Sequence, residues 1–212
     1  MSSLCCFVNP ASSTEARRNE DACPECGRAF GFPLTSPPSA IRDYEIVEPL
    51  GRGFYAATYR ARRGALGREW VLKVAPIRLY EFFKKDFEAE CALHDEVARH
   101  SDHLVELIDR FEETIDFGDV ELECHVAVLE YVEGPSLDQF CEERENPSAL
   151  AAAQIAIDLF GLLGELQSRE AHHNDLHAAN LIVERLPPRR ARAYAIDRSI
   201  RLVAIDLGSA AD

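Results

Sequence analysis

The chain has 212 residues, which at roughly 150 residues per domain allows one ordinary domain with a small appendage. Hydrophobic residues make up 47% of the sequence and charged residues 28%, close to the average of folded chains, and this composition excludes wholesale disorder. The formal net charge of −14 repels phosphodiesters and anionic lipids, so we expect neither nucleic acid nor a membrane as partner.

Two features of the chain predict a cytoplasmic protein. The best apolar segment, residues 150–166, is interrupted by Asp158 and Glu165 and falls short of the ~18 uncharged residues of a membrane span. The apolar stretch at residues 4–8 is too short for the core of a secretory signal, and no basic residue precedes it. We therefore expect the chain to stay in the cytosol.

Residues 1–31 are polar and rich in cysteine. They hold four of the seven cysteines, namely Cys5, Cys6, Cys23 and Cys26. The second pair forms a Cys-x-x-Cys turn typical of half a zinc site, whereas two adjacent thiolates chelate one ion less readily. We predict a zinc-ribbon-like module with all four cysteines as Zn²⁺ ligands, and the alternative is a degenerate ribbon with free thiols. Three prolines in residues 32–40 predict a linker over 32–43.

From residue 44 the sequence changes to short β-like runs separated by glycine-containing turns. Apolar residues predict strands over 44–50, 55–61 and 70–75, the start of an antiparallel sheet. Between the first two strands, Gly51 and Gly53 would let the backbone approach a phosphate without obstruction by a Cβ atom. A tight hairpin would use the same glycines, so this motif alone leaves both interpretations open.

The third predicted strand carries Lys73 between apolar neighbours. Such a lysine must reach an edge of the sheet or find an anion. The helical period over 81–100 places Glu90 on the same stripe as Phe83 and Val97, and a carboxylate on an apolar face requires a buried cation. We therefore predict a Lys73–Glu90 pair. The alternative is an edge lysine that prevents aggregation of strands.

The remaining elements follow the same logic. We predict two strands, a long helix and two further short strands, over 104–111, 122–131, 148–167, 181–183 and 201–205. The apolar stripe of the helix consists of Ile155, Leu159, Leu162 and Leu166. The basic stretch 185–192 between the last two strands is predicted to be a solvated loop, with a docking patch for an acidic segment as the alternative.

The richest motif is His173-Asn174-Asp175-Leu176-His177-Ala178-Ala179-Asn180. Asp175 and Asn180 are five residues apart, and Asp206 ends the last predicted strand two residues before Gly208. An amide and a carboxylate that converge make a hard-oxygen site suited to Mg²⁺, and a second carboxylate nearby could accept a hydroxyl proton. A transition-metal cluster that includes His172 and His177 is the alternative.

Taken together, these residues resemble the protein-kinase signature set, in the expected chain order over residues 44–210. The resemblance implies an α+β, two-lobe fold: a five-stranded N-lobe with one helix and the hinge over 44–132, and a partial helical C-lobe over 133–212. Together with Asn9-Pro10, the N-terminal cysteines resemble the zinc-ribbon leaders of some bacterial Ser/Thr kinases.

The resemblance also implies a role for each candidate residue in binding ATP. By position, Gly51 and Gly53 would cover the phosphates of ATP. Lys73, paired with Glu90, would hold the α and β phosphates.

The hinge and the catalytic loop are assigned in the same way. Backbone groups of Glu130 and Val132 would contact adenine. Asp175 would orient and deprotonate the acceptor hydroxyl, while Asn180 and Asp206 would hold Mg²⁺. The implied activity is transfer of the γ-phosphoryl group of ATP to a Ser/Thr hydroxyl of a protein.

Three positions depart from the family pattern. Ala56 stands where a third loop glycine is usual. Asn174 replaces an arginine, which removes a counter-charge for a phosphorylated activation segment. His177 stands where protein kinases generally have a lysine, and this form resembles small-molecule kinases of the aminoglycoside or choline type. That activity and a non-catalytic nucleotide-binding or scaffolding remnant are the two alternatives.

The sequence ends four residues after Gly208. A complete kinase C-lobe would need on the order of a hundred more residues, so we expect a fragment or a truncated product. The helix over 148–167 would then leave apolar surface uncovered, which favours a partner at that face.

Overall fold

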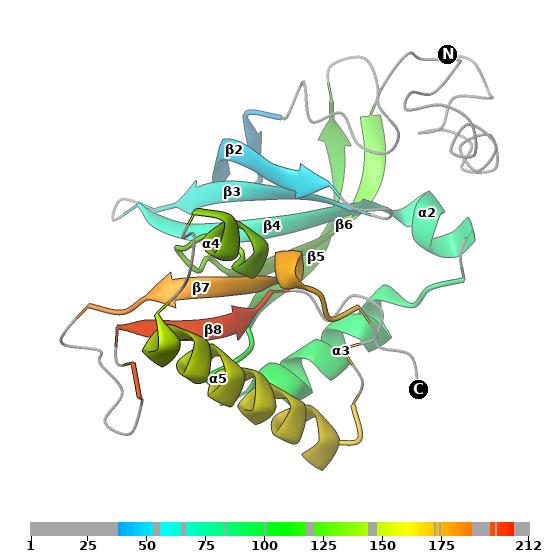
Figure 1. The fold of residues 1–212 in the computed structure, drawn as a ribbon. Helices are drawn as coiled ribbons and strands as arrows, with labels where there is room; N and C mark the ends of the chain where they lie inside the picture. The colour runs from blue at the N-terminus through cyan, green and yellow to red at the C-terminus, as the bar shows by residue number, and fades with distance from the viewer. Residues whose placement is uncertain are drawn as a thin grey trace, which may run out of the picture. The chain divides into compact units, whose positions relative to one another are not determined.

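The computed structural model describes residues 38–205, except 53–55, 65–66, 83, 100, 118–120, 144–147, 172, 174, 188–195 and 198. These residues fall into two compact units (Figure 1). The sheet unit comprises the described residues up to Glu88 together with Leu107–Tyr131. The helical unit comprises Ala89–Glu106 and the described residues from Val132 onward.

The sheet unit is built on an antiparallel sheet in the order β1-β2-β3-β4-β6-β5. Its strands are β1 (Ala40–Ile41), β2 (Tyr44–Arg52), β3 (Ala57–Arg63), β4 (Arg68–Pro76), β5 (Leu107–Asp116) and β6 (Glu121–Glu130). The five predicted strands are therefore present, with shifted ends. The sixth, β1, lies in the predicted linker and pairs with β2 through Ala40–Glu45 and Ile41–Tyr44. At two residues, it is too short to show an alternating pattern.

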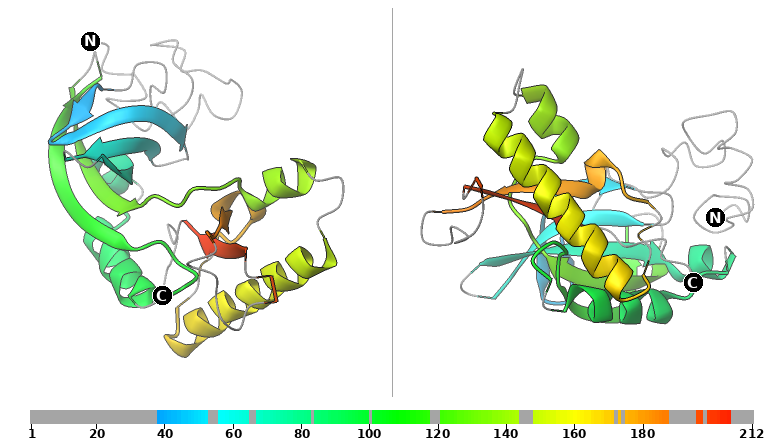
Figure 2. Two further views of the ribbon diagram at one scale, coloured as in Figure 1. Left: turned by 90° about the vertical axis from the view of Figure 1, so that its left-hand side faces the viewer. Right: turned by 60° about the horizontal axis from the view of Figure 1, so that its bottom comes forward.

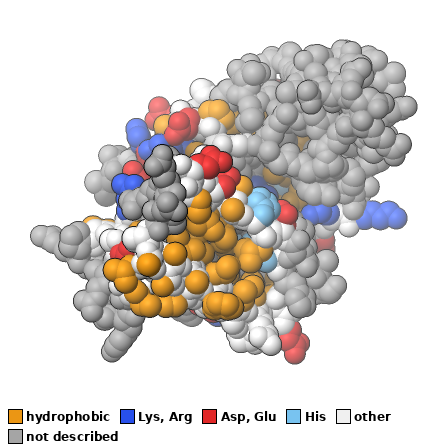
Figure 3. Space-filling view, in the orientation of Figure 1, with side chains coloured by type: hydrophobic (Ala, Val, Ile, Leu, Met, Phe, Trp, Pro, Cys, Tyr) orange, Lys and Arg blue, Asp and Glu red, His pale blue; other side chains and the backbone are white. Residues whose placement is uncertain are grey.

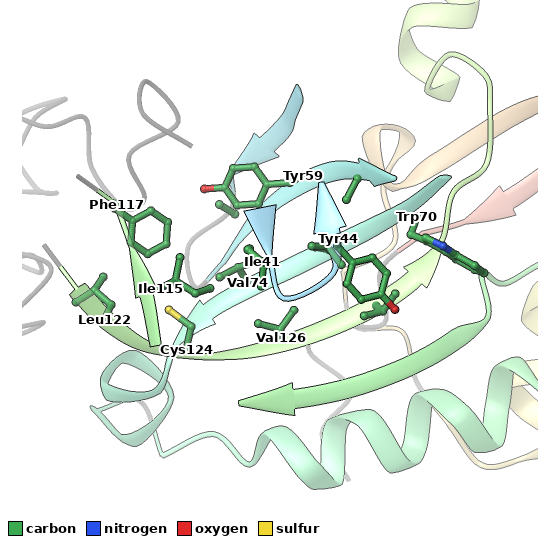
Figure 4. Packing of buried hydrophobic residues seen from close by; sticks show 14 residues of the cluster. Ile41, Tyr44, Tyr59, Trp70, Val74, Ile115, Phe117, Leu122, Cys124 and Val126 are labelled. Atoms are coloured by element: carbon green, nitrogen blue, oxygen red, sulfur yellow. The ribbon is translucent and has the colours of Figure 1, made fainter. Parts of the chain in front are cut away.

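The core of this unit follows the two-residue period of its strands. In β4, for example, Leu72 and Val74 are buried while Val71 and Lys73 are only half-buried. Figure 4 shows the buried side chains packed together, with Tyr59 and Val126 contributed by other strands of the sheet. Alternation thus gives each strand one core face and leaves the other face for different contacts.

The predicted helix over 81–100 is two helices, α2 (Ile77–Phe82) and α3 (Phe87–Ala98). The chain leaves α2 through Lys84, whose φ of 53° is in the left-handed region, and the Lys85 N–H donates to the Tyr80 carbonyl oxygen at 2.9 Å. A left-handed residue ends a helix. Because this residue is not a glycine, the break between the two helices could not be predicted from the sequence. In α3, Phe87, Cys91, His94 and Val97 are spaced three or four residues apart and are all buried, whereas Phe83 of the predicted stripe lies outside the described residues.

An aromatic cluster attaches the first residue of α3 to the sheet. The Phe87 ring stacks on His125 of β6, with ring centroids 4.4 Å apart and an interplanar angle of 7°. Tyr80 of α2 meets both rings edge-on, at 5.8 Å from Phe87 and 5.5 Å from His125. Such contacts stabilise a fold beyond the area they bury.

This cluster predicts a loss of stability in mild acid. Burial lowers the pKa of His125 below its ordinary value of 6.5, although the carboxylates of Glu112, Glu88 and Glu81 oppose that shift. As the pH falls below 6.5, the unfolded chain binds a proton that the folded chain binds only at lower pH, so the free energy of unfolding decreases. We expect His125→Phe to flatten this pH dependence in denaturant titrations between pH 5 and 7. An unchanged slope in the variant would contradict the assignment.

The helical unit consists of the rest of α3, three further helical segments and a two-stranded sheet. These are α4 (Leu137–Glu143), α5 (Ala149–Ser168), the 3-10 turn η1 (Ala178–Asn180), β7 (Leu181–Arg185) and β8 (Ile200–Ala204). Figure 2 shows α5 beside the β7–β8 pair. The predicted long helix is confirmed, and the Ala151 N–H donates to the hydroxyl of its N-cap, Ser148, at 3.1 Å.

We did not predict α4, although its sequence carries a start signal. The backbone N–H of Ser136 donates to the side-chain oxygen of Gln139 at 3.2 Å, and the Phe140 N–H donates to the Ser136 carbonyl oxygen at 2.8 Å. Ser136-x-x-Gln139 has the sequence signature of a capping box, and the contact from the Ser136 N–H to Gln139 is one half of that motif. It follows directly on the Gly-Pro turn at 134–135.

The long helix α5 is more apolar than the sequence interpretation allowed. By length and composition alone α5 could cross a membrane, because its two acidic residues do not offset the apolar ones. Core helices pass the same test, and α5 buries Asp158 and Leu162 inside the helical unit. It also exposes four large apolar side chains: Leu150, Ile157, Phe160 and Leu163. Figure 3 shows hydrophobic side chains gathered on one face of the molecule.

Candidate functional site

The glycine-rich segment begins where β2 becomes irregular. The pairing of β2 with β3 shifts between Ile46 and Glu48 and again between Pro49 and Gly51. Gly51 pairs with Thr58, whose hydroxyl donates to the Gly51 carbonyl oxygen at 3.3 Å. Among the described residues, a Cβ atom at position 51 would meet only this hydroxyl, at an ordinary 3.7 Å. Packing against the described residues therefore does not require a glycine at position 51. Gly53 lies outside the described residues.

Lys73 lies on an interior strand of the sheet. Its strand β4 pairs with β3 on one side and β6 on the other, and Lys73 is opposite Thr58 and Ala127. The alternative of an edge lysine is therefore wrong. Lys73 is half-buried, on the face opposite to the core residues Leu72 and Val74. A cation in this position requires an anionic partner or solvent.

The two glutamates at the start of α3 differ in their surroundings. Glu88 is exposed, and its carboxylate accepts a hydrogen bond from Arg110 of β5 at 2.8 Å. Glu90 is half-buried and belongs to the helical unit, whereas Lys73 belongs to the sheet unit. The predicted Lys73–Glu90 pair would therefore link residues of two units, and it stays a prediction.

The predicted hinge follows the last strand of the sheet unit. Glu130 is the last residue of β6 and pairs with Trp70. The Arg60 guanidinium lies 4.9 Å from the centroid of the Tyr131 ring, and Val132, the first residue of the helical unit after it, is buried. The segment thus leaves the sheet at the residues to which adenine contacts were assigned, and those contacts stay a prediction.

The catalytic-loop residues come together around η1. The Asn180 side-chain amide Nδ2 donates to the main-chain oxygen of Asp175 at 3.1 Å and lies 3.4 Å from its carboxylate Oδ2. His177 Nε2 lies 3.7 Å from the same Oδ2, and the Asn180 N–H donates to the His177 carbonyl oxygen at 3.0 Å. The Asp175 side chain is 58% exposed. A carboxylate held in this way is accessible to a substrate hydroxyl.

The end of β8 lies beside Asn180. The ladder pairs Leu181 with Ala204, and the Ile205 N–H donates to the Asn180 carbonyl oxygen at 3.1 Å. Asp206, the next residue, lies outside the described part of the chain. The motif that sequence spacing singled out is therefore built on the ends of two paired strands.

The donor atoms fit a hard cation. The Asn180 amide nitrogen contacts Asp175, and among the described residues no hydrogen bond engages its side-chain oxygen. Amide and carboxylate oxygens suit Mg²⁺. Within the described ranges there is no group of three or more His, Cys, Asp or Glu side chains that could hold a metal. His172 and the four N-terminal cysteines lie outside those ranges.

One further carboxylate near this loop was not predicted from the sequence. Asp138 lies in α4, which contacts η1. Its pKa is lowered by hydrogen bonds from the Ser136 hydroxyl and from backbone N–H groups, and by the nearby His177. The Ser136-x-x-Gln139 pattern was the sequence signal that could have placed Asp138 at the start of a helix.

One unit is a sheet with a lysine on a central strand, and the other holds an aspartate and an asparagine beside a pair of strands. This combination is typical of a protein-kinase-like α+β fold. The family model described as the protein kinase domain matches residues 44–212. The chain therefore belongs to the protein kinase domain family. This confirms the predicted family and fold class, whereas the zinc-ribbon module of residues 1–31 stays a prediction.

Similar proteins agree with this membership. The chain is 24% identical over 147 residues to the serine/threonine-protein kinase PknA of Nostoc sp., a match over 66% of this chain and 25% of that protein. It is 29% identical over 146 residues to the serine/threonine-protein kinase PLK4 of Aedes aegypti, over 68% of this chain and 18% of that protein. The matches thus span about a quarter or less of each relative.

A solved structure shares the fold. The crystal structure of Rad53 residues 1–466 in complex with AMP-PNP superposes with a TM-score of 0.61 at 19% sequence identity. The match covers 77% of this chain and 38% of that one. At this identity the likeness supports the fold alone.

Proposed function

We propose that this chain transfers the γ-phosphoryl group of ATP to Ser or Thr hydroxyls of a protein, with Mg²⁺ as the cofactor. The observation that carries the proposal is the cluster of Asp175, His177 and Asn180 at the end of the β7–β8 ladder. The similar kinases named above are serine/threonine-protein kinases, which favours a protein substrate.

Each residue of the loop has a task in this reaction. The exposed carboxylate of Asp175 would orient the acceptor hydroxyl and take its proton. The Asn180 oxygen, together with Asp206, would hold Mg²⁺. When bound with ATP, the ion neutralises charge on the phosphates and aligns them. Lys73 of β4 and the backbone at Gly51 would bind the phosphates from the sheet unit.

A small-molecule acceptor is the second candidate, and His177 is the observation that favours it. Its imidazole lies 3.7 Å from the Asp175 carboxylate, where protein kinases generally have a lysine. The histidine side chain is shorter than a lysine side chain, so the space that it leaves for the acceptor molecule differs from that in protein kinases. The two candidates differ in substrate size and not in the chemistry of the transfer.

The test combines binding and transfer. We expect Mg·ATP to raise the midpoint of thermal unfolding, because ligand that binds only the folded state stabilises it. With γ-labelled ATP, label should appear on Ser or Thr of unstructured protein substrates and not on amino-alcohol metabolites. Label on metabolites alone would support the second candidate. A thermal shift without any transfer would indicate a non-catalytic nucleotide-binding chain and overturn the proposal.

A further inference from the structure

Helix α5 buries two polar side chains, Gln154 and Asp158, on the face that it turns to the core of the helical unit. Gln154 is 2% exposed and Asp158 is 1% exposed, and they lie one helical turn apart. A buried carboxylate costs several kcal/mol unless it is hydrogen-bonded. The pair therefore requires an explanation other than core packing.

The hydrogen bonds of the pair run from α5 to the segment that forms β8. Gln154 Oε1 accepts from the backbone N–H groups of Ile196 at 2.7 Å and Asp197 at 3.2 Å. Its Nε2 donates to Asp158 Oδ1 at 2.9 Å, and Asp158 Oδ2 accepts from the Leu202 N–H at 3.0 Å. One chain of hydrogen bonds thus holds both the approach to β8 and its central residue.

The chemistry at each position is fixed by the backbone donors. A backbone N–H can only donate, so the atom of Gln154 facing Ile196 and Asp197 must be its oxygen, and its NH₂ group must face Asp158. Residue 158 must then accept with both of its side-chain oxygens. A carboxylate can do this and an amide cannot, which explains an aspartate in the apolar stripe of α5.

The position of β8 decides where the proposed cation ligands lie. Leu202 pairs with Val183, and three residues later the Ile205 N–H donates to the Asn180 carbonyl oxygen. A slip of β8 by one residue would move this end by about 3.3 Å and reverse every side chain. Fixing Leu202 against α5 therefore fixes the chain next to Asn180, just before Asp206.

We infer that Gln154 and Asp158 are a positioning pair for the catalytic loop. They contact neither nucleotide nor substrate, and act by holding the register of β8. This role rests on the proposed function, since the end of β8 matters for catalysis only if Asn180 and Asp206 bind Mg²⁺.

The test uses a single and a compensating double substitution in the full chain. In Asp158→Asn, the new side-chain NH₂ group would face another hydrogen-bond donor, either the Leu202 N–H or Gln154 Nε2. We expect faster amide exchange over residues 199–205 without nucleotide, and a roughly tenfold or greater rise in the Mg²⁺ concentration needed for half-maximal transfer, the scale of other outer-shell changes.

Gln154→Glu combined with Asp158→Asn restores the four donor–acceptor contacts described above. The carboxylate at position 154 accepts from Ile196 and Asp197 and from the amide at position 158, whose oxygen accepts from Leu202. We expect exchange and Mg²⁺ dependence to return toward wild type. Gln167→Glu, the same change at an exposed position of α5, is the matched control and should change neither.

Two results would overturn the inference: a double variant as impaired as the single one, or a single variant with wild-type exchange and Mg²⁺ dependence. Amide exchange needs neither ATP nor turnover, so it tests the register of β8 even if the wild type transfers no phosphoryl group. A wild-type chain without transfer would contradict the proposed function, and the test of the β8 register would still be valid.

Discussion

Asp175→Asn should lower the turnover number by about 10²- to 10⁴-fold, the usual contribution of a positioned general base. The Asp175 carboxylate is accessible to solvent and is flanked by His177 and Asn180, so it is the group that can take the hydroxyl proton. An amide of the same shape cannot accept that proton. The measurement is steady-state transfer of γ-labelled phosphate at saturating Mg·ATP.

Two controls distinguish a loss of proton transfer from a loss of nucleotide binding and from the removal of a negative charge. The thermal shift caused by Mg·ATP should persist in Asp175→Asn, because its Asn180 contact through the main-chain oxygen of residue 175 does not use the carboxylate. Glu142→Gln removes a carboxylate from an exposed position in α4 and should leave turnover unchanged. Wild-type turnover in Asp175→Asn would remove Asp175 from the mechanism.

The sheet unit was accessible to sequence reasoning because its strands bury every second residue. The predicted run 70–75 lies within β4, and the run 122–131 differs from β6 by one residue at each end. Lys73 follows this alternation, on the half-buried face of a strand with neighbours on both sides, and its apolar neighbours in sequence were therefore informative. The left-handed backbone of Lys84 could not be predicted, since nothing in the neighbouring sequence distinguishes it from a lysine within a helix.

In the helical unit, the role of a residue can depend on hydrogen-bond partners that are far away in the sequence. Asp158 looked like an interruption in an apolar segment, and its explanation lies 44 residues away in the Leu202 N–H. The catalytic loop was predictable because Asp175 and Asn180 are close in the chain and make their contact locally. Gly53, Asp206 and the zinc ligands lie outside the described residues, and their roles stay predictions.

Gly134→Ala should destabilise the protein by about 1 to 3 kcal/mol or more, the range for overpacking. A Cβ atom at position 134 would lie 2.3 Å from the Val183 carbonyl oxygen and 2.9 Å from its carbon. These are backbone atoms, and they cannot give way easily because the Val183 N–H donates to the Pro135 carbonyl oxygen at 2.9 Å. Ser136 also bridges to Ile182. Either the turn or β7 must move.

Gly164→Ala is the matched control, since a Cβ atom there meets none of the described residues within 4 Å. In a helix interior this change should stabilise the protein by about 0.5 to 1 kcal/mol. Denaturant titrations of both variants give the free energy of unfolding, and equal values would contradict the close approach of the turn to β7. Because β7 begins directly after Asn180, we expect Gly134→Ala also to raise the Mg²⁺ requirement of transfer. Gly164→Ala should leave that requirement unchanged.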